Sequence, residues 1–271
     1  LFIACQQPHN VNDPLQVLCL GNSITKHPIK EDIEWFSDWG MAASNIEYDY
    51  CHQLEKMLCK YHPNSTVTPL NIASWERNLS CDIDSLIGSY CKNKDIIIIR
   101  LGENVQDVTT FPDAISRLVK YCQSKAKRVI ITGCFWKKDS KERSIIHAAR
   151  TNDLTYVPLY WIDNLYNVRP QIGDTLYDIN KKPYVITQDF IITHPNDEGM
   201  QMISDAIAAE KKASPIDFEH LLLEMYEDIE LILKLLPYSK DYRNPDKSEK
   251  TSEILRLVEA KSMFRKYTEK K

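Results

Sequence analysis

Asp95-Ile96-Ile97-Ile98-Ile99-Arg100-Leu101 is the stretch that decides the fold class, because its unbroken isoleucines predict a strand with apolar side chains on both faces. Strands of this kind occur in parallel sheets that helices cover on each side. Further strand patterns stand at residues 15–21, 67–73, 128–133 and 156–162, and helical patterns at 49–61, 112–124, 141–149 and 195–211. Their alternation predicts an α/β protein with three layers, in which a parallel five-stranded sheet lies between two layers of helices.

Length and composition set the outer bounds. The chain has 271 residues, of which 43% are hydrophobic and 27% charged, as in ordinary soluble domains. Its formal net charge of -4 argues against nucleic acid as the main partner. The patterns divide the chain into an N-terminal linker at 1–14, a main domain at 15–212 and a helical extension at 213–271.

The C-terminal extension carries two amphipathic helical patterns. Ser214-Pro215 is a helix-start signal, and the apolar positions after it form a broad face that is too hydrophobic to stay in water alone. Pro237 ends this pattern, and a second one follows from about Ser252. The apolar face either packs on the main domain or is an interface for another chain, for example in self-association.

The first residues resemble a targeting signal. Leu1-Phe2-Ile3-Ala4-Cys5 is similar to the end of a bacterial lipoprotein signal, in which a small residue precedes the cysteine that receives the lipid. This interpretation predicts an exported protein, periplasmic or on the cell surface, that a lipid on Cys5 anchors to a membrane. The alternative is an apolar N-terminus without this role. In an oxidising compartment Cys81 and Cys91 could form a disulfide, whereas the absence of any C-x-x-C pair argues against a zinc site.

Three short polar segments lie where a functional site is expected. They are Gly21-Asn22-Ser23-Ile24-Thr25 and Gly102-Glu103-Asn104, which follow predicted strands, and His194-Pro195-Asn196-Asp197, which precedes the last helical pattern. Ligands of parallel sheets bind at the carboxyl ends of the strands. Ser23 is therefore a candidate nucleophile, His194 the base that takes its proton, and Asn104 a side-chain donor to an oxyanion. Taken singly, Ser23 could instead cap a helix, and Asn104 could belong to an ordinary turn.

The order and context of these motifs resemble the SGNH (GDSL-type) hydrolases, a family of esterases and lipases with a flavodoxin-like fold. The resemblance covers about residues 15–212 and implies a serine esterase that requires neither metal nor cofactor. It also implies that backbone N–H groups at Ser23 and near Glu76 complete the oxyanion hole. Asn22 and Glu76 depart from the family pattern, which has an aspartate and a glycine there. Because an inward carboxylate would oppose an oxyanion, we expect the Glu76 side chain to turn away.

A third departure leaves open what orients His194. The family's triad aspartate stands three residues before the histidine, where this chain has Ile191. Such an acid holds the tautomer of the imidazole, and weakening that role can cost about 10⁴ in rate. A backbone carbonyl could replace it and make a Ser-His dyad, Asp189 or another acid could reach the ring, or the protein could be slow or inactive. Pro195 is expected in the first turn of the following helix.

Aromatic residues near these motifs indicate a carbohydrate ligand. Trp39 and Trp75 could form a wall on which a sugar ring stacks, or they could belong to the core. The predicted function is the hydrolysis of carboxylic esters, above all of O-acetyl groups on carbohydrates. The rival is a non-catalytic surface module that binds glycans or takes part in assembly, and a further alternative is acyl transfer to a sugar.

Overall fold

A parallel sheet of five strands forms the centre of the protein, whose computed structural model describes residues 13–136 and 138–209. The strands are β1 (Gln16–Gly21), β2 (Thr66–Asn71), β3 (Ile96–Ile99), β4 (Arg128–Thr132) and β5 (Thr155–Val157). Their order in the sheet is β2-β1-β3-β4-β5, and every neighbouring pair is parallel. Because the strands are parallel, the segments that follow them leave the sheet at the same edge. Since β1 lies between β2 and β3, the segments after these three strands are neighbours there.

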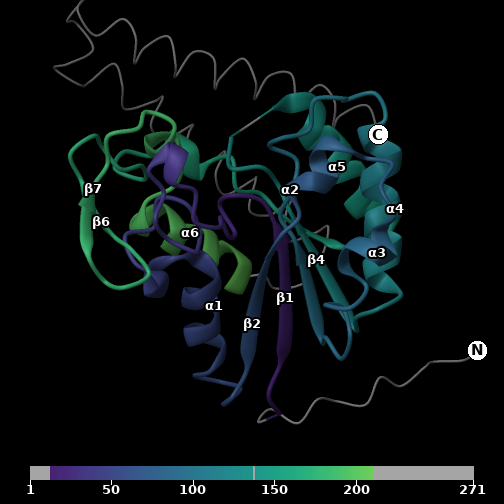
Figure 1. Cartoon of the computed structure of the whole chain (residues 1–271). Helices are drawn as coiled ribbons and strands as arrows, with labels where there is room; N and C mark the ends of the chain where they lie inside the picture. The colour runs from purple at the N-terminus through teal and green to yellow at the C-terminus, as the bar shows by residue number, and fades with distance from the viewer. Residues whose placement is uncertain (1–12, 137, 210–271) are drawn as a thin grey trace, which may run out of the picture. The chain divides into compact units, whose positions relative to one another are not determined.

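Helices cover both faces of this sheet (Figure 1). One face carries α1 (Tyr50–Leu58) and α6 (Asp197–Ala208), and the other carries α3 (Ile83–Ile87), α4 (Phe111–Gln123) and α5 (Asp139–Thr151). Alternate residues of β1 enter the two cores: Val17 and Cys19 pack with α1 and α6, whereas Leu18 and Leu20 pack with α4 and α5. The predicted α/β fold, with helices on both faces of a five-stranded parallel sheet, is confirmed.

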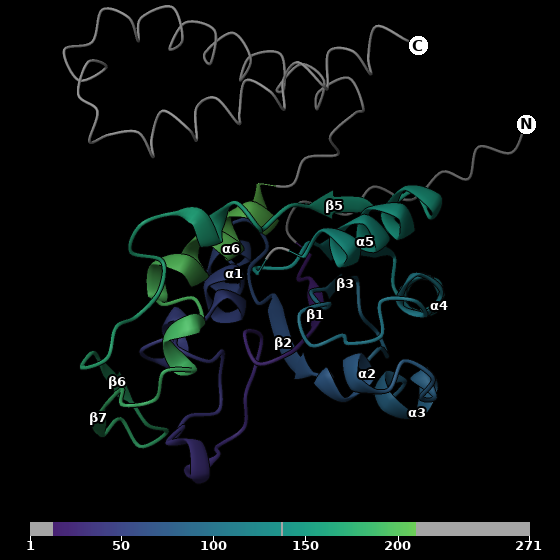
Figure 2. The ribbon, with the colours of Figure 1, turned by 90° about the horizontal axis from the view of Figure 1, so that it is seen from above.

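The structure adds short elements that the sequence patterns do not predict. α2 (Ala73–Arg77) directly follows β2 and, like α3, spans only 5 residues, too few for helical periodicity to show. A small antiparallel hairpin of β6 (Thr175–Tyr177) and β7 (Pro183–Val185) lies outside the main sheet (Figure 2). Its apolar residues join the core on the side of α1 and α6.

Two predicted element ends are wrong. The strand expected at 156–162 ends at Val157, because the Pro158 that follows has no N–H for the ladder. The last helix begins at Asp197, so Pro195 precedes the N-cap and is not in the first turn. The cap is Asn196, whose side chain accepts a hydrogen bond from Gly199 N at 3.0 Å.

Several expectations concern residues outside the described part of the chain. Lipidation of Cys5, the export that would follow, and the two helices expected at 213–271 stay predictions. Within residues 13–136 and 138–209, no helix is long and apolar enough to cross a membrane. All the cysteines of these ranges are free, including Cys81 and Cys91.

Candidate active site

The predicted serine and histidine meet at the carboxyl edge of the sheet. Ser23 lies two residues after β1, and His194 stands between α6 and a short 3₁₀ helix at Ile191–Thr193. Ser23 Oγ lies 2.9 Å from His194 Nε2, although 171 residues separate them in the chain. The serine hydroxyl therefore faces a potential proton acceptor.

The turn that presents Ser23 depends on Gly21. Thr25 N and Lys26 N both donate to Asn22 O, at 2.9 and 3.0 Å, so the chain turns sharply around Ser23. A Cβ atom on Gly21 would lie 1.8 Å from Thr25 Oγ1 and 3.2 Å from the carbonyl oxygen of Arg100. This close approach is what requires glycine here.

A backbone carbonyl orients the imidazole of His194. Its Nδ1 lies 3.0 Å from Phe190 O, and a carbonyl oxygen can only accept a hydrogen bond. Nδ1 therefore carries the proton, and the lone pair of Nε2 faces Ser23 Oγ. Ile191, at the family's acid position, is buried in the apolar core, and Asp189 is exposed.

Burial keeps His194 uncharged, and two aromatic rings pack against its imidazole. The residue is 7% exposed, and this burial lowers the pKa of its imidazole to about 4, against the opposing effect of the hydrogen bond to Phe190 O. The ring of Trp136 stands edge-on to the imidazole with centroids 5.0 Å apart, and that of Phe190 does so at 6.3 Å. Trp136 Nε1 also donates to Thr193 O at 2.9 Å, which ties the Trp136 side chain to the histidine segment.

Sequence reasoning missed both aromatic neighbours of the histidine. Trp136 follows β4 by four residues, and this place at the carboxyl edge is the signal that could have identified it. Phe190 orients His194 through its main-chain oxygen, which no side-chain motif reveals.

The two tryptophans that were expected to stack on a sugar are core residues. Trp39 is 4% exposed, and its Nε1 donates to Ala43 O at 3.0 Å. Trp75 is fully buried and packs edge-on against Phe111, with centroids 6.3 Å apart. Large rings remove much apolar surface from water when they are buried, and here that gain places both inside. The prediction that they bind substrate is wrong.

The Glu76 side chain points inward, contrary to expectation. It is 1% exposed, and its Oε1 accepts hydrogen bonds from Gly102 N at 2.6 Å and Asn104 N at 3.2 Å. Its Oε2 accepts from Asn104 Nδ2 at 2.7 Å. These donors replace water around the buried carboxylate. Asn104, the candidate oxyanion donor, thus has one amide hydrogen on Glu76, and the same nitrogen carries a second hydrogen.

A buried polar network continues from Glu76 to Asn22, Arg100 and Glu103. Arg100, which is fully buried, donates to Glu103 Oε1 at 2.6 Å and to Asn22 Oδ1. Asn22 Nδ2 donates to Glu103 Oε2 at 2.7 Å and to Glu76 Oε1 at 3.3 Å. An aspartate at position 22 would add a third carboxylate to this cluster, whereas the asparagine amide serves both acids and the arginine. The departure from the family pattern at Asn22 therefore has a physical reason.

The two carboxylates of the network titrate in opposite directions. Burial raises the pKa of Glu103, but the adjacent Arg100 guanidinium, together with hydrogen bonds from Phe135 N and Asn22, outweighs it and leaves that pKa below its usual value. The pKa of Glu76 is raised, by burial and by the negative charge of Glu103. Arg100 thus stabilises chiefly the charge of Glu103.

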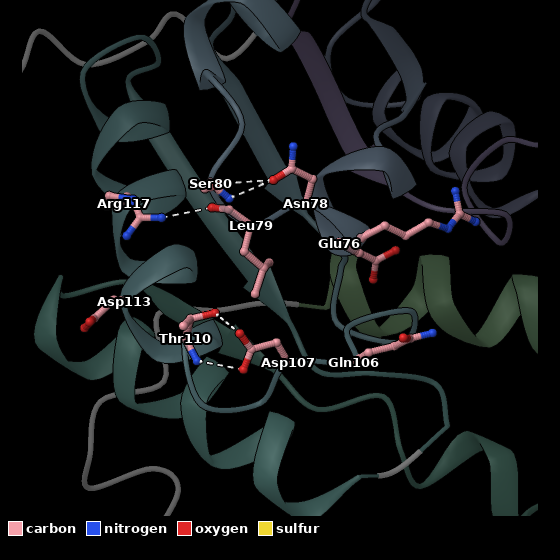
Figure 3. Close-up of a pocket in the computed structure, with 10 residues that line it drawn as sticks. Glu76, Asn78, Leu79, Ser80, Gln106, Asp107, Thr110, Asp113 and Arg117 are labelled. Carbon is pink, nitrogen blue, oxygen red and sulfur yellow. Dashed lines mark hydrogen bonds between the residues drawn. The ribbon is translucent and has the colours of Figure 1, made fainter.

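A polar pocket of about 740 Å³ lies beside Glu76 (Figure 3). Its wall is formed by Glu76, Arg77, Asn78, Leu79, Ser80, Gln106, Asp107, Thr110, Asp113 and Arg117. Arg117 Nη2 donates to Leu79 O at 2.9 Å, and Asp107 accepts from the Thr110 hydroxyl at 2.7 Å. A wall so rich in hydrogen-bonding groups suits a ligand with many hydroxyls.

Comparison with known proteins gives distant likenesses only. No family model matches the sequence, and no curated protein matches it either. A metagenomic α/β hydrolase from Lake Arreo, Spain, is 12% identical with a TM-score of 0.49, over 73% of this chain and 95% of that one. A variant of an acetyl xylan esterase from Geobacillus stearothermophilus is 14% identical with a TM-score of 0.43, over 73% and 95%.

A third solved structure is a candidate lipolytic protein of the G-D-S-L family from Desulfitobacterium hafniense. It is 12% identical with a TM-score of 0.42, over 72% of this chain and 98% of that one. Likenesses at this level carry no information on reaction or substrate. The G-D-S-L family named for this third structure is the one that the three motifs resemble.

Proposed function

We propose that the chain is a serine ester hydrolase of the SGNH type that works through a Ser-His dyad. The observation that carries the proposal is the 2.9 Å contact between Ser23 Oγ and His194 Nε2, with Nδ1 of the same ring bound to Phe190 O. A serine hydroxyl becomes a nucleophile when a base takes its proton. His194 is such a base at neutral pH, because burial lowers its pKa to about 4 and leaves Nε2 unprotonated.

The reaction follows from this geometry. Ser23 Oγ attacks the acyl carbon while its proton passes to His194 Nε2, and the carbonyl oxygen becomes an oxyanion. The free hydrogen of Asn104 Nδ2 and backbone N–H groups at Ser23 and Glu76 hold that oxyanion. The bond to the alcohol then breaks, and the alcohol leaves with the proton from His194. Water attacks the acyl-serine in the same way, which releases the acid and restores Ser23.

In the proposed dyad, the carbonyl oxygen of Phe190 takes over the orienting role that an acidic side chain has in a triad. In a triad, the acid fixes the imidazole tautomer and stabilises the positive charge that forms during acyl transfer. Phe190 O fixes the tautomer equally well, but it carries only a partial charge. We therefore propose an enzyme in which the histidine has the same tautomer as in a triad. The positive charge that forms on its imidazole is stabilised less than it would be by an acidic side chain.

For the substrate we propose O-acetyl groups on carbohydrates. The support is the polar pocket beside Glu76, because a sugar offers hydroxyls to side chains such as Asn78, Gln106 and Arg117. Glu76 lines this pocket and also contacts Asn104, so one residue joins the pocket wall to the proposed oxyanion donor.

We expect the protein to release acetate from acetylated xylo-oligosaccharides and to prefer acetyl over octanoyl esters by about tenfold or more in kcat/KM. The exposed charged side chains of Arg77, Asp107 and Asp113 line the pocket, and a long acyl chain packed on them would remove them from water without giving them a partner. Free acetate and acetylated sugar acceptors are measured together by mass spectrometry, which separates hydrolysis from acyl transfer. A preference for octanoyl esters would contradict the carbohydrate proposal and leave the serine chemistry standing.

The lowered pKa of His194 predicts activity at mildly acidic pH. A base works in its unprotonated form, so protonation of His194 lowers kcat/KM only as the pH drops toward the pKa of about 4, not near the ordinary imidazole value of 6.5. The measurement is the pH profile of kcat/KM for an activated acetyl ester. An acid limb centred near 6.5 would show that His194 is more solvated than its burial indicates.

A further inference from the structure

We infer that Glu76 is a positioning residue of the oxyanion hole, whose carboxylate fixes which end of the Asn104 amide faces the reacting ester. The inference rests on the proposed function for its catalytic part. A carboxylate oxygen accepts hydrogen bonds and cannot donate them, so the amide end that contacts Glu76 Oε2 at 2.7 Å must be the nitrogen. The second hydrogen on that nitrogen is then available for an oxyanion. If the amide turned over, its oxygen would occupy this place and would repel the oxyanion.

Every hydrogen-bond partner of the Glu76 carboxylate is a donor. Its two oxygens receive hydrogen bonds from Gly102 N, Asn104 N, Asn104 Nδ2 and Asn22 Nδ2. A protonated carboxyl group would direct an O–H toward one of these N–H groups, so the arrangement fits the ionised form. The same hydrogen-bond donors also disperse the negative charge of the Glu76 carboxylate, which reduces the repulsion between that carboxylate and a nearby oxyanion.

Glu76 also holds the backbone turn on which Asn104 stands. Gly102 has a φ of +136°, a conformation that side chains rarely adopt, and its N–H donates to Glu76 at 2.6 Å. The N–H of Asn104 is bound to the same oxygen. Glu76 therefore fixes both the main chain and the side chain of the residue that is to stabilise the transition state.

The surroundings of Glu76 make this anchor sensitive to pH. Glu103 and Arg100 face it from the segment after β3, Cys134 from the segment after β4, and Arg77 follows it in α2. Burial and Glu103 together raise the pKa of Glu76, whereas burial raises that of the Cys134 thiol and keeps it neutral. As the pH falls, Glu76 is protonated at a higher pH than an ordinary glutamate, and the Asn104 anchor is lost.

The test compares Glu76→Gln, Glu76→Asp and a matched control, Glu55→Gln. Glu55 also accepts a backbone hydrogen bond, from Val67 N at 2.7 Å, but near the amino end of β2. Glutamine at position 76 would donate toward Asn104 and favour the turned amide. We expect Glu76→Gln to lower kcat by roughly 100-fold with KM changed less than about threefold, as for the loss of one oxyanion donor. Glu76→Asp keeps the carboxylate and is expected to recover part of kcat, and Glu55→Gln is expected to match the wild type.

The pH profile distinguishes positioning from a purely structural role. In the wild type the acid limb reflects the protonation of both Glu76 and His194, so it is steeper than a one-proton limb. In Glu76→Gln it becomes a one-proton limb that belongs to His194. If all four proteins share one kcat and one pH profile, Glu76 has no positioning role, and the proposed function is untouched.

A second readout needs no turnover. In protein labelled with ¹⁵N-asparagine, the side-chain amide signal of Asn104 is assigned by its absence in Asn104→Ala. We expect it to shift with pH as Glu76 titrates in the wild type and in Glu55→Gln, and to stay constant in Glu76→Gln. If the wild type hydrolyses no ester, the proposed function fails, and the amide titration still decides whether Glu76 controls Asn104. If the chemical shift of the Asn104 side-chain amide does not change with pH in the wild type, the inference is overturned.

Discussion

Replacement of Ser23 or His194 by alanine is expected to lower kcat/KM for an activated acetyl ester by about 10⁴-fold or more. Ser23→Ala removes the atom that forms the acyl intermediate, and His194→Ala removes the proton acceptor 2.9 Å from it. Because the two residues act as one unit, the double variant is expected to lose no more than either single variant. The measurement is steady-state hydrolysis by the purified proteins.

Matched controls and a covalent probe complete this experiment. Ser89→Ala and His147→Ala remove the same residue types from exposed positions and are expected to leave turnover unchanged. A fluorophosphonate forms a bond only with an activated serine, so it is expected to label the wild type and not Ser23→Ala. If the wild type shows neither turnover nor labelling, the protein is better described as a glycan-binding or assembly module that retains the fold.

Arg100→Met is expected to destabilise the protein by about 3–5 kcal/mol at pH 7. Arg100 and Glu103 are both fully or almost fully buried, and their contact of 2.6 Å is the main ionic bond of the network. Without the guanidinium, Glu103 and Glu76 are two buried carboxylates that keep hydrogen-bond donors but lose the ion pair with Arg100. The free energy of unfolding is measured in urea, with Arg143→Met as an exposed control that is expected to change it by less than about 0.5 kcal/mol.

The loss of unfolding free energy in Arg100→Met is expected to depend on pH, and to be largest near neutral pH. In the wild type, the lowered pKa of Glu103 contributes stability that is present above its unfolded pKa and disappears as the pH falls. In Arg100→Met that pKa is raised instead, so the folded state takes up a proton and loses stability as the pH rises. The difference between the two proteins is therefore largest near neutral pH and narrows toward pH 4. A destabilisation that is constant across this range would mean that packing, not charge, dominates at Arg100.

The sequence was sufficient to predict the sheet, its longer flanking helices and the strand ends at which Ser23 and Asn104 stand. The isoleucines of β3 and the alternation of patterns carry that information locally. Arg100 also carries information in the sequence. A charged residue at the end of a strand that is buried on both faces requires a buried partner of opposite charge. Glu103, three residues later, is that partner.

The remaining features depend on contacts between distant segments. Glu76 was expected to turn away because an inward carboxylate would oppose an oxyanion. The donors that hold it inside come from residues 22, 102 and 104, which no local pattern brings together. For Trp39 and Trp75 the sequence allowed both a sugar-binding wall and a place in the core, and only the packing of distant segments decides for the core. Short elements such as α2 and β6 lie below the length at which periodicity can be recognised.

The carbonyl of Phe190 also changes how such a protein can vary during evolution. An acidic side chain behind a histidine is lost by a single codon change, whereas a main-chain oxygen is present whatever residue occupies its position. Selection then acts on the shape of the 190–194 turn and leaves the identity of its residues freer. A search that requires an aspartate near the histidine would not find a chain in which a main-chain oxygen takes that position.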